Sequence, residues 1–257
     1  MYLSKYDLTG RVAVVTGGGG NIGLACAEAL AEAGAMVIVG GSRDSQTART
    51  GITRLRDRGY VGEDSRFDVR DREAVETACA ALIRRHGRVD VLVCAAGGGG
   101  ARGATEHLDP AEWHEIVELN LAGVFHCCAV FGRHMLERRA GAIVNIGSLS
   151  GTIVNRPQLQ AAYNAAKAGV HHLTRSLATE WASRGVRVNA VAPTYVDAPG
   201  RYGLDDPALF PVWMAATPMN RQARADEVAS TVLFLASDAS SMITGQVMHV
   251  DGGYTCW

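Results

Sequence analysis

The stretch Val12-Ala-Val-Val-Thr16-Gly-Gly-Gly-Gly20-Asn21-Ile22-Gly23 decides the fold, and a helix-forming run, Leu-Ala-Cys-Ala-Glu-Ala-Leu, follows it directly. A β-branched apolar run, a glycine turn and a helix come here in the order that a dinucleotide site requires. Glycine lets the backbone approach a pyrophosphate, and the start of the helix offers it free N–H groups. A tight turn without a ligand is the alternative, but the position after the first strand favours nucleotide binding.

The rest of the chain repeats this alternation of short apolar runs and longer alanine-rich segments. The expected strands are Val12–Thr16, Met36–Val39, Val61–Phe67, Val89–Cys94, Ala142–Ile146, Val186–Val191 and Gln246–Val250, and the expected helices are Ile22–Ala33, Ser45–Arg58, Arg72–Arg85, Pro110–Arg138, Gln160–Arg184 and Asp226–Ala236. Strands that are apolar throughout are typical of a parallel sheet buried on both faces. The pattern predicts an α/β fold over residues 1–257: a single doubly wound Rossmann-type domain with a parallel sheet of about seven strands flanked by helices.

The segment from Pro193 to Pro218 interrupts this rhythm, because it holds five of the seven prolines. That density excludes one continuous helix. Long irregular segments in compact domains are usually lids or binding loops, so we predict a substrate lid at about residues 194–225. A purely structural excursion is the alternative.

Composition narrows the class of protein. The 257 residues are 47% hydrophobic and 20% charged, with a formal net charge of −1. These values suit a packed core and argue against binding to nucleic acid or to an anionic membrane. No apolar run reaches the roughly 18 residues that a bilayer-spanning helix needs, and Met1–Gly10 does not resemble a signal peptide. A soluble, cytoplasmic protein with a small-molecule substrate is expected.

The cysteines and histidines give no metal-binding pattern. The six cysteines show no C-x-x-C spacing, and the eight histidines form no H-E-x-x-H. We therefore expect buried thiols in a reducing compartment and no metal site. His171 and His172 form a pair on a predicted helix, which we expect at the surface or at an interface.

A tyrosine and a lysine carry the predicted chemistry. Lys167 is one of only two lysines, and it follows Tyr163 at the spacing that places two side chains on one face of a helix. A phenol with a pKa of about 10 is a poor proton donor or acceptor at neutral pH, and a nearby ammonium lowers that pKa. Ser148 follows the predicted strand 142–146, at the sheet edge where ligands sit. On its own the Tyr–Lys pair also fits a structural role.

These features together resemble the short-chain dehydrogenase/reductase family. Thr16, Gly17 and Gly23 match its fingerprint T-G-x-x-x-G-x-G, with Asn21 in place of the middle glycine. Asparagine tolerates the left-handed backbone region better than most residues, so the turn can survive this change. The resemblance extends over essentially the whole chain. It includes the segment from Arg187 to Pro193, after which the family has a glycine and this chain has Thr194.

The resemblance implies a catalytic set of four residues. Ser148 would hold the substrate oxygen, and Tyr163 would pass a proton to or from it. Lys167 would tune Tyr163 and hold the cofactor ribose, and Asn120 would support a water beside the lysine. For Asn120, a helix-interior asparagine bonded to the backbone is the alternative.

The resemblance also implies a nicotinamide dinucleotide cofactor. The residues expected to bind it are Gly17, Asn21, Ile22, Gly23, Ser42, Arg43, Asp68, Val69, Ala96, Gly97, Tyr163, Lys167, Pro193, Thr194 and Val196. The family places an acidic residue near position 41 when NAD is used, whereas this chain has Gly40-Gly41-Ser42-Arg43. An arginine suits a 2′-phosphate, so NADP(H) is favoured modestly over NAD(H).

The segment Ser148–Gln160 and the C-terminal run are similar to those of polyol and ketose members of the family. The residues expected to bind substrate are Ser150, Asn155, Gln158, Gln160 and Trp213, although the polar ones would equally serve as turn caps and Trp213 as lid core. An NAD(P)-dependent oxidoreductase for a secondary alcohol and its ketone, a sugar alcohol and ketose pair, is the leading hypothesis. A 3-oxoacyl or other carbonyl reductase and a non-catalytic dinucleotide sensor are the alternatives. The family also implies a homotetramer.

Overall fold

Seven parallel strands form one sheet in the order β3-β2-β1-β4-β5-β6-β7 in the computed structural model, which describes residues 1–41, 46–99, 103–198 and 207–257. The strands are β1 (Val12–Thr16), β2 (Met36–Gly41), β3 (Gly62–Arg66), β4 (Val91–Cys94), β5 (Gly141–Ile146), β6 (Val186–Pro193) and β7 (Val247–Val250). The expected strands are confirmed, with ends that differ by two residues at most. Every neighbouring pair is parallel, so all carboxyl ends lie at one edge.

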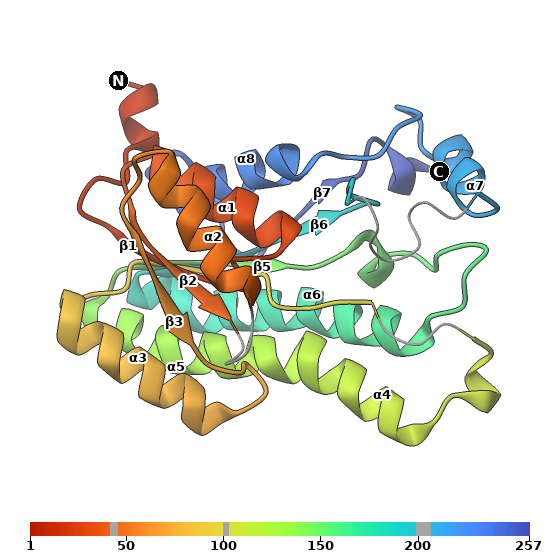
Figure 1. The fold of residues 1–257 in the computed structure, drawn as a ribbon, viewed down its shortest axis with the longest axis horizontal. Coiled ribbons are helices and arrows are strands. Elements are labelled where there is room, and N and C mark those ends of the chain that lie inside the picture. Colours follow the sequence, from red (N-terminus) through yellow and green to blue (C-terminus); the bar gives the residue numbers. More distant parts are fainter. Residues whose placement is uncertain (42–45, 100–102, 199–206) are drawn as a thin grey trace.

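Helices cover both faces of this sheet (Figure 1). α1 (Asn21–Glu32), α2 (Gln46–Asp57) and α8 (Ala225–Ala236) lie on one face, and α3 (Arg72–His86), α5 (Gly123–Arg138) and α6 (Ala161–Trp181) lie on the other. α4 (Pro110–Val117) precedes α5, and the short α7 (Phe210–Ala216) follows β6. The doubly wound α/β fold predicted from the sequence is confirmed.

Alternate residues of the central strands enter opposite layers of the core. Val15 of β1 and Val39 of β2 pack with α1, α2 and α8, whereas Val14 and Ile38 pack with α3, α5 and α6. Both faces of these strands are therefore buried, which explains why their sequences are apolar throughout. Five of the six cysteines are buried free thiols, as expected, whereas Cys256 is exposed.

The helix predicted over Pro110–Arg138 begins as the sequence suggests but is not one regular helix. Asp109 caps it by accepting a hydrogen bond from the N–H of Ala111, and Pro110 takes its first position. A π-helical turn, Glu118–Ala122, separates α4 from α5. Such turns within helices are frequent at functional sites, and this one carries Asn120.

By length and hydropathy alone, the segment Pro110–Arg138 would be able to cross a bilayer, since an 18-residue window in it has a mean hydropathy of 1.4. The expectation that no membrane-length apolar segment exists needs this correction. Half of that window is buried inside the protein, and α5 packs on α3, β4 and β5. The apolar character of the segment is therefore that of a core helix.

The predicted lid at 194–225 contains α7, a helix that the sequence analysis did not locate. Residues 199–206 lie outside the described part of the chain, as do the expected cofactor residues Ser42 and Arg43. Val196 forms a parallel bridge with Ala223, and the N–H of Asp197 donates to the carbonyl of Ala223 (2.8 Å). The beginning and the end of the segment are therefore tied together.

Candidate active site

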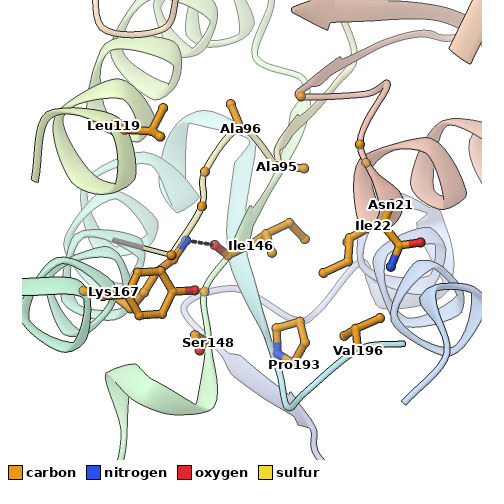
Figure 2. A pocket seen from close by; sticks show the side chains of 18 of the residues that line it. Asn21, Ile22, Ala95, Ala96, Leu119, Ile146, Ser148, Lys167, Pro193 and Val196 are labelled. Carbon is orange, nitrogen blue, oxygen red and sulfur yellow. Dashed lines mark hydrogen bonds between the residues drawn. The ribbon is translucent and has the colours of Figure 1, made fainter. Parts of the chain in front are cut away.

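A cavity of about 580 Å³ opens at the carboxyl edge of the sheet. It lies where β1 neighbours β2 on one side and β4 on the other, which is the point at which the strand order reverses. Figure 2 shows Asn21 and Ile22 on one side of the cavity and Ser148 and Lys167 on the other. The sequence-predicted residues that line it are Gly17, Asn21, Ile22, Gly23, Asp68, Val69, Ala96, Gly97, Ser148, Ser150, Asn155, Gln158, Gln160, Tyr163, Lys167, Pro193, Thr194 and Val196.

The glycine turn forms a cradle without side chains at one end of the cavity. Gly17 has a φ of +64°, and a Cβ on it would lie 2.8 Å from the backbone of Ala96. A Cβ on Gly23 would collide with the carbonyl of Gly17. Gly20 caps α1 without any side-chain hydrogen bond, so the backbone N–H groups at the start of α1 face no capping side chain. These positions require glycine for space and leave donors for an anion.

Asn21, which stands where the family has a glycine, ties the cradle to the opposite side of the cavity. Its Nδ2 donates a hydrogen bond to the carbonyl of Asp197 (2.7 Å). In Figure 2 the Asn21 side chain is directed toward Val196, the neighbour of Asp197 in the chain. The departure from the fingerprint therefore has a structural role in this protein.

At the end of β3, the carboxylate of Asp68 is already engaged by an arginine that the sequence analysis did not single out. Arg70 Nη2 lies 2.6 Å from Asp68 Oδ2, and Arg70 Nε lies 3.0 Å from Oδ1. These hydrogen bonds hold the pKa of Asp68 below its usual value. Both side chains line the cavity, so its wall carries a neutralised pair here rather than a lone anion.

Lys167 and Tyr163 meet on the face of α6 that lines the cavity. Lys167 is buried, and its Nζ lies 5.6 Å from the centroid of the Tyr163 ring. Nζ donates a hydrogen bond to the carbonyl of Ile146 at the end of β5 (2.9 Å, Figure 2). Burial lowers the pKa of Lys167 to about 8. The spacing read from the sequence therefore brings a phenol and an amine together at the cavity.

Ser148 lies two residues beyond the end of β5, where it caps a short 3₁₀ turn. Its Oγ accepts a hydrogen bond from the N–H of Ser150 (3.1 Å) and donates one to Ser150 Oγ (3.0 Å). Figure 2 shows Ser148 near Lys167, on the same side of the cavity. The strand end thus presents a hydroxyl close to the phenol and amine of α6.

Asn120 is buried beside the cavity but is not one of the described residues that line it. Its Nδ2 donates to the carbonyl of Ile116 (3.0 Å), and its Oδ1 accepts from the N–H of Gly98 (3.2 Å). A Cβ on Gly97 would lie 3.0 Å from Asn120 Oδ1 and 3.5 Å from Lys167 Nζ. Asn120 therefore binds backbone on both sides, and only the space at Gly97 separates it from the lysine.

Tyr195, two residues beyond β6, is a cavity residue that the sequence analysis missed. Its hydroxyl oxygen accepts hydrogen bonds from Asn155 Nδ2 (3.0 Å) and Gln158 Nε2 (2.8 Å). Its ring stacks on Trp213, which donates from Nε1 to Gln158 Oε1 (2.9 Å). Trp213 is fully buried and lies outside the described lining, so it supports Tyr195 instead of facing the cavity as a substrate residue. Its position just after a strand end is the sequence signal that would have identified Tyr195.

The expected surface pair of histidines is only half at the surface, because His171 is 3% exposed and His172 is exposed. The imidazole of His171 fills the space beside Gly147 and Gly151, where an added Cβ would collide with it. These two glycines flank Ser148 and Ser150, so His171 supports the serine turn from behind. Burial, with the charges of His249, Lys167 and Arg175 adding to it, lowers the pKa of His171 to about 4.

This lowered pKa predicts a loss of stability in acid. An unfolded histidine with a pKa of about 6.5 binds a proton before the folded one does, so protonation favours the unfolded chain as the pH falls toward 4. The full shift corresponds to about 3 kcal/mol. Urea unfolding at pH 7 and pH 4 measures the effect. We expect His171→Gln to remove most of this loss of unfolding free energy and the control His172→Gln to retain it. Equal pH profiles for all three proteins would show that His171 does not titrate in this way.

Comparisons with known proteins agree with this geometry. Residues 18–255 match a family model described as enoyl-(acyl carrier protein) reductase. The chain is 49% identical to galactitol 2-dehydrogenase from Rhizobium johnstonii (100% of this chain, 99% of the relative) and 44% identical to galactitol 2-dehydrogenase (L-tagatose-forming) from Cereibacter sphaeroides, with the same coverage. A gluconate 5-dehydrogenase from Burkholderia cenocepacia, solved with NADP and tartrate, superposes with a TM-score of 0.93 at 36% identity over 100% of both chains.

Proposed function

Because the chain belongs to the short-chain dehydrogenase/reductase family, we propose that it interconverts a sugar alcohol and the matching ketose. It is an NAD(P)-dependent oxidoreductase that acts on CH–OH groups. The observation that carries the proposal is the buried Lys167 beside Tyr163 on the wall of a glycine-lined cavity. A non-catalytic dinucleotide sensor would not need this pair.

In the proposed mechanism, Tyr163 exchanges a proton with the substrate hydroxyl. The Lys167 ammonium beside the ring stabilises the phenolate that forms when Tyr163 gives up its proton. The carbonyl of Ile146 holds Nζ in place, so the amine stays near the ring throughout the reaction. Ser148 would turn its hydroxyl hydrogen from Ser150 Oγ to the substrate oxygen and so stabilise the developing alkoxide. Asn120 acts indirectly, by fixing the backbone at Gly98 beside the lysine.

The residues at the cradle fit a dinucleotide. Gly17, Gly23 and the start of α1 would hold its pyrophosphate, since a Cβ at either glycine would obstruct the backbone there. Ala96, Gly97 and the segment Pro193–Val196 would line its nicotinamide half. When bound, this group accepts or supplies the hydride of the carbinol carbon.

Replacing Gly17 with alanine tests the cradle. The added Cβ meets the Ala96 backbone at 2.8 Å and forces alanine into a φ of +64°. We expect a loss of about 1–3 kcal/mol in unfolding free energy and at least a roughly tenfold rise in the dinucleotide Kd, measured by fluorescence titration. Gly59→Ala is the matched control, because Gly59 has a similar φ of +79° with nothing within 4 Å. Wild-type affinity in Gly17→Ala would contradict the assignment.

We propose NADP(H) as the preferred cofactor. β2 ends at Gly40-Gly41, followed in the sequence by Ser42-Arg43, so a glycine stands at the position where the family has an acidic residue in its NAD-dependent members. Asp68, the carboxylate on the nearby wall, is already paired with Arg70. An arginine two residues beyond Gly41 in the sequence suits a 2′-phosphate, which supports the preference.

A substrate panel tests the proposed function. The wall beyond Ser148 carries Ser150, Asn155, Gln158 and Gln160, and a site built from hydrogen-bonding groups favours substrates with several hydroxyls. We expect kcat/KM for hexitols or hexuloses to exceed that for 3-oxoacyl thioesters, and NADP(H) to exceed NAD(H), followed by nicotinamide absorbance. Turnover of the thioesters alone would replace the polyol proposal with the reductase alternative.

A cytoplasmic homotetramer is the proposed form of the protein. The family commonly associates through helices in the positions of α4, α5 and α6. Trp113 on α4 and Phe125 on α5 are large apolar side chains that remain exposed in the single chain, at 37% and 42%. Exposed aromatic groups on these helices support an interface between copies.

A further inference from the structure

We propose that Tyr195 determines substrate specificity by donating a hydrogen bond to a substrate hydroxyl remote from the carbon oxidised at Tyr163. The inference rests on the proposed polyol activity and names the side chain that would distinguish a polyol from a simple secondary alcohol. Asn155 and Gln158, which the sequence analysis expected to bind substrate, would then position the Tyr195 hydroxyl through their hydrogen bonds to it.

Both side-chain hydrogen bonds of Tyr195 use its hydroxyl oxygen as the acceptor, so the O–H remains as a donor. A phenol oxygen accepts up to two hydrogen bonds and donates one. Asn155 Nδ2 and Gln158 Nε2 fill both acceptor positions. Among the hydrogen bonds of the described residues, none uses the Tyr195 O–H as donor. The Tyr254 hydroxyl is its other polar neighbour, with ring centroids 6.0 Å apart, and makes the smallest contribution to the raised pKa of Tyr195. The remaining O–H belongs to a side chain on the cavity wall.

The phenol is held rigidly and stays protonated. Its ring is stacked on Trp213 with centroids 4.1 Å apart and planes 12° apart, and Trp213 is itself fixed by its hydrogen bond to Gln158. Burial raises the pKa of Tyr195 to about 12, against the opposing effect of the two amide donors. Tyr195 therefore presents a donor, never an anion, at working pH, and little rotamer entropy is lost when a ligand binds.

A continuous polar wall connects Tyr195 with the reacting end of the site. Gln160 Nε2 donates to both Asn155 Oδ1 (3.0 Å) and Ser150 Oγ (3.2 Å), and Ser150 contacts Ser148. Asn155 in turn binds Tyr195. A substrate with one hydroxyl would use only the Ser148 end of this wall, whereas one with several hydroxyls would also reach Tyr195.

Tyr195→Phe is the test, because phenylalanine retains the ring stacked on Trp213 and removes only the hydroxyl. We expect kcat/KM for a hexitol to fall about 10- to 100-fold, mainly through KM, while kcat/KM for cyclohexanol changes less than about threefold. Tyr60→Phe is the matched control, since Tyr60 packs on the core beside α1, α2 and α8 and its hydroxyl is not part of the described cavity wall. The dinucleotide Kd should be unchanged in both variants.

The outcomes separate this inference from the proposed function. Wild-type protein without activity on any polyol would overturn the proposed function, and the inference with it. Wild-type activity on polyols combined with equal losses on hexitol and cyclohexanol in Tyr195→Phe, or with the same losses in Tyr60→Phe, would overturn the inference alone.

Single-deoxy hexitols provide a second measurement that does not depend on how well the variant folds. In the wild-type protein, removing one remote hydroxyl should lower kcat/KM by about as much as Tyr195→Phe does. That same deoxy substrate should then lose nothing further in the variant, because both changes remove one hydrogen bond. A wild-type protein that accepts every remote deoxy analogue as well as the parent hexitol would overturn the inference.

Discussion

Replacing Tyr163 with phenylalanine is expected to lower kcat about 10²- to 10⁴-fold while the dinucleotide Kd stays within about twofold of wild type. The ring beside Lys167 remains, so the amine keeps its neighbour and the cavity keeps its shape. Only the hydroxyl that exchanges the substrate proton is removed. Steady-state rates on a polyol, combined with fluorescence titration of the dinucleotide, measure the two quantities separately.

Tyr6→Phe serves as the control for this experiment. Tyr6 lies near the N-terminus, its ring packs near that of Phe234, and it is not one of the described residues that line the cavity. It should retain wild-type kcat. If Tyr163→Phe kept more than about a tenth of wild-type kcat, the proton would have to be handled by another group.

Replacing Lys167 with methionine should lower kcat/KM by about 10²- to 10⁴-fold and at the same time stabilise the folded protein. Burial lowers the pKa of Lys167 to about 8, so at pH 7 the folded state carries a buried charge that the unfolded chain holds in water. The shift corresponds to about 3 kcal/mol, which the methionine variant recovers in part, because it also loses the hydrogen bond to Ile146. Activity and stability therefore change in opposite directions.

The burial of Lys167 also predicts how the free energy of unfolding changes with pH. Between pH 8 and the unfolded pKa of 10.5, the unfolded chain binds more protons at Lys167 than the folded chain does. Wild-type stability should therefore rise with pH across this range, and the rise should be absent in Lys167→Met. Lys5, the other lysine, is exposed, and Lys5→Met should leave both activity and the pH profile unchanged. A methionine variant less stable than wild type at pH 7 would contradict the burial argument.

The sheet was predictable because parallel strands buried on both faces leave a plain apolar signal. β3 was the weakest prediction, since this edge strand reads Gly-Glu-Asp-Ser-Arg and pairs on one side only. The Tyr163–Lys167 pair was predictable because both residues lie on one helix, four positions apart, so their spacing alone places them on one face.

Contacts between distant segments were beyond the reach of the sequence patterns. Tyr195 is positioned by Asn155 and Gln158, about forty residues earlier in the chain, and by Trp213, which the sequence offered as a substrate residue or as lid core. The burial of His171 likewise depends on the absence of side chains at two glycines in another segment. No periodicity within a helix or strand records such relations.

The imidazole of His171 also constrains the order in which this region can diverge. A methyl group at Gly147 has no room while the histidine is present, so this glycine cannot be replaced until position 171 becomes smaller, whereas Gly151 is also confined by the backbone of Lys167. A smaller residue at 171 is admissible first, at the expense of a void behind the serine turn. Descendant proteins that carry alanine at 147 should therefore have passed through a lineage already altered at 171.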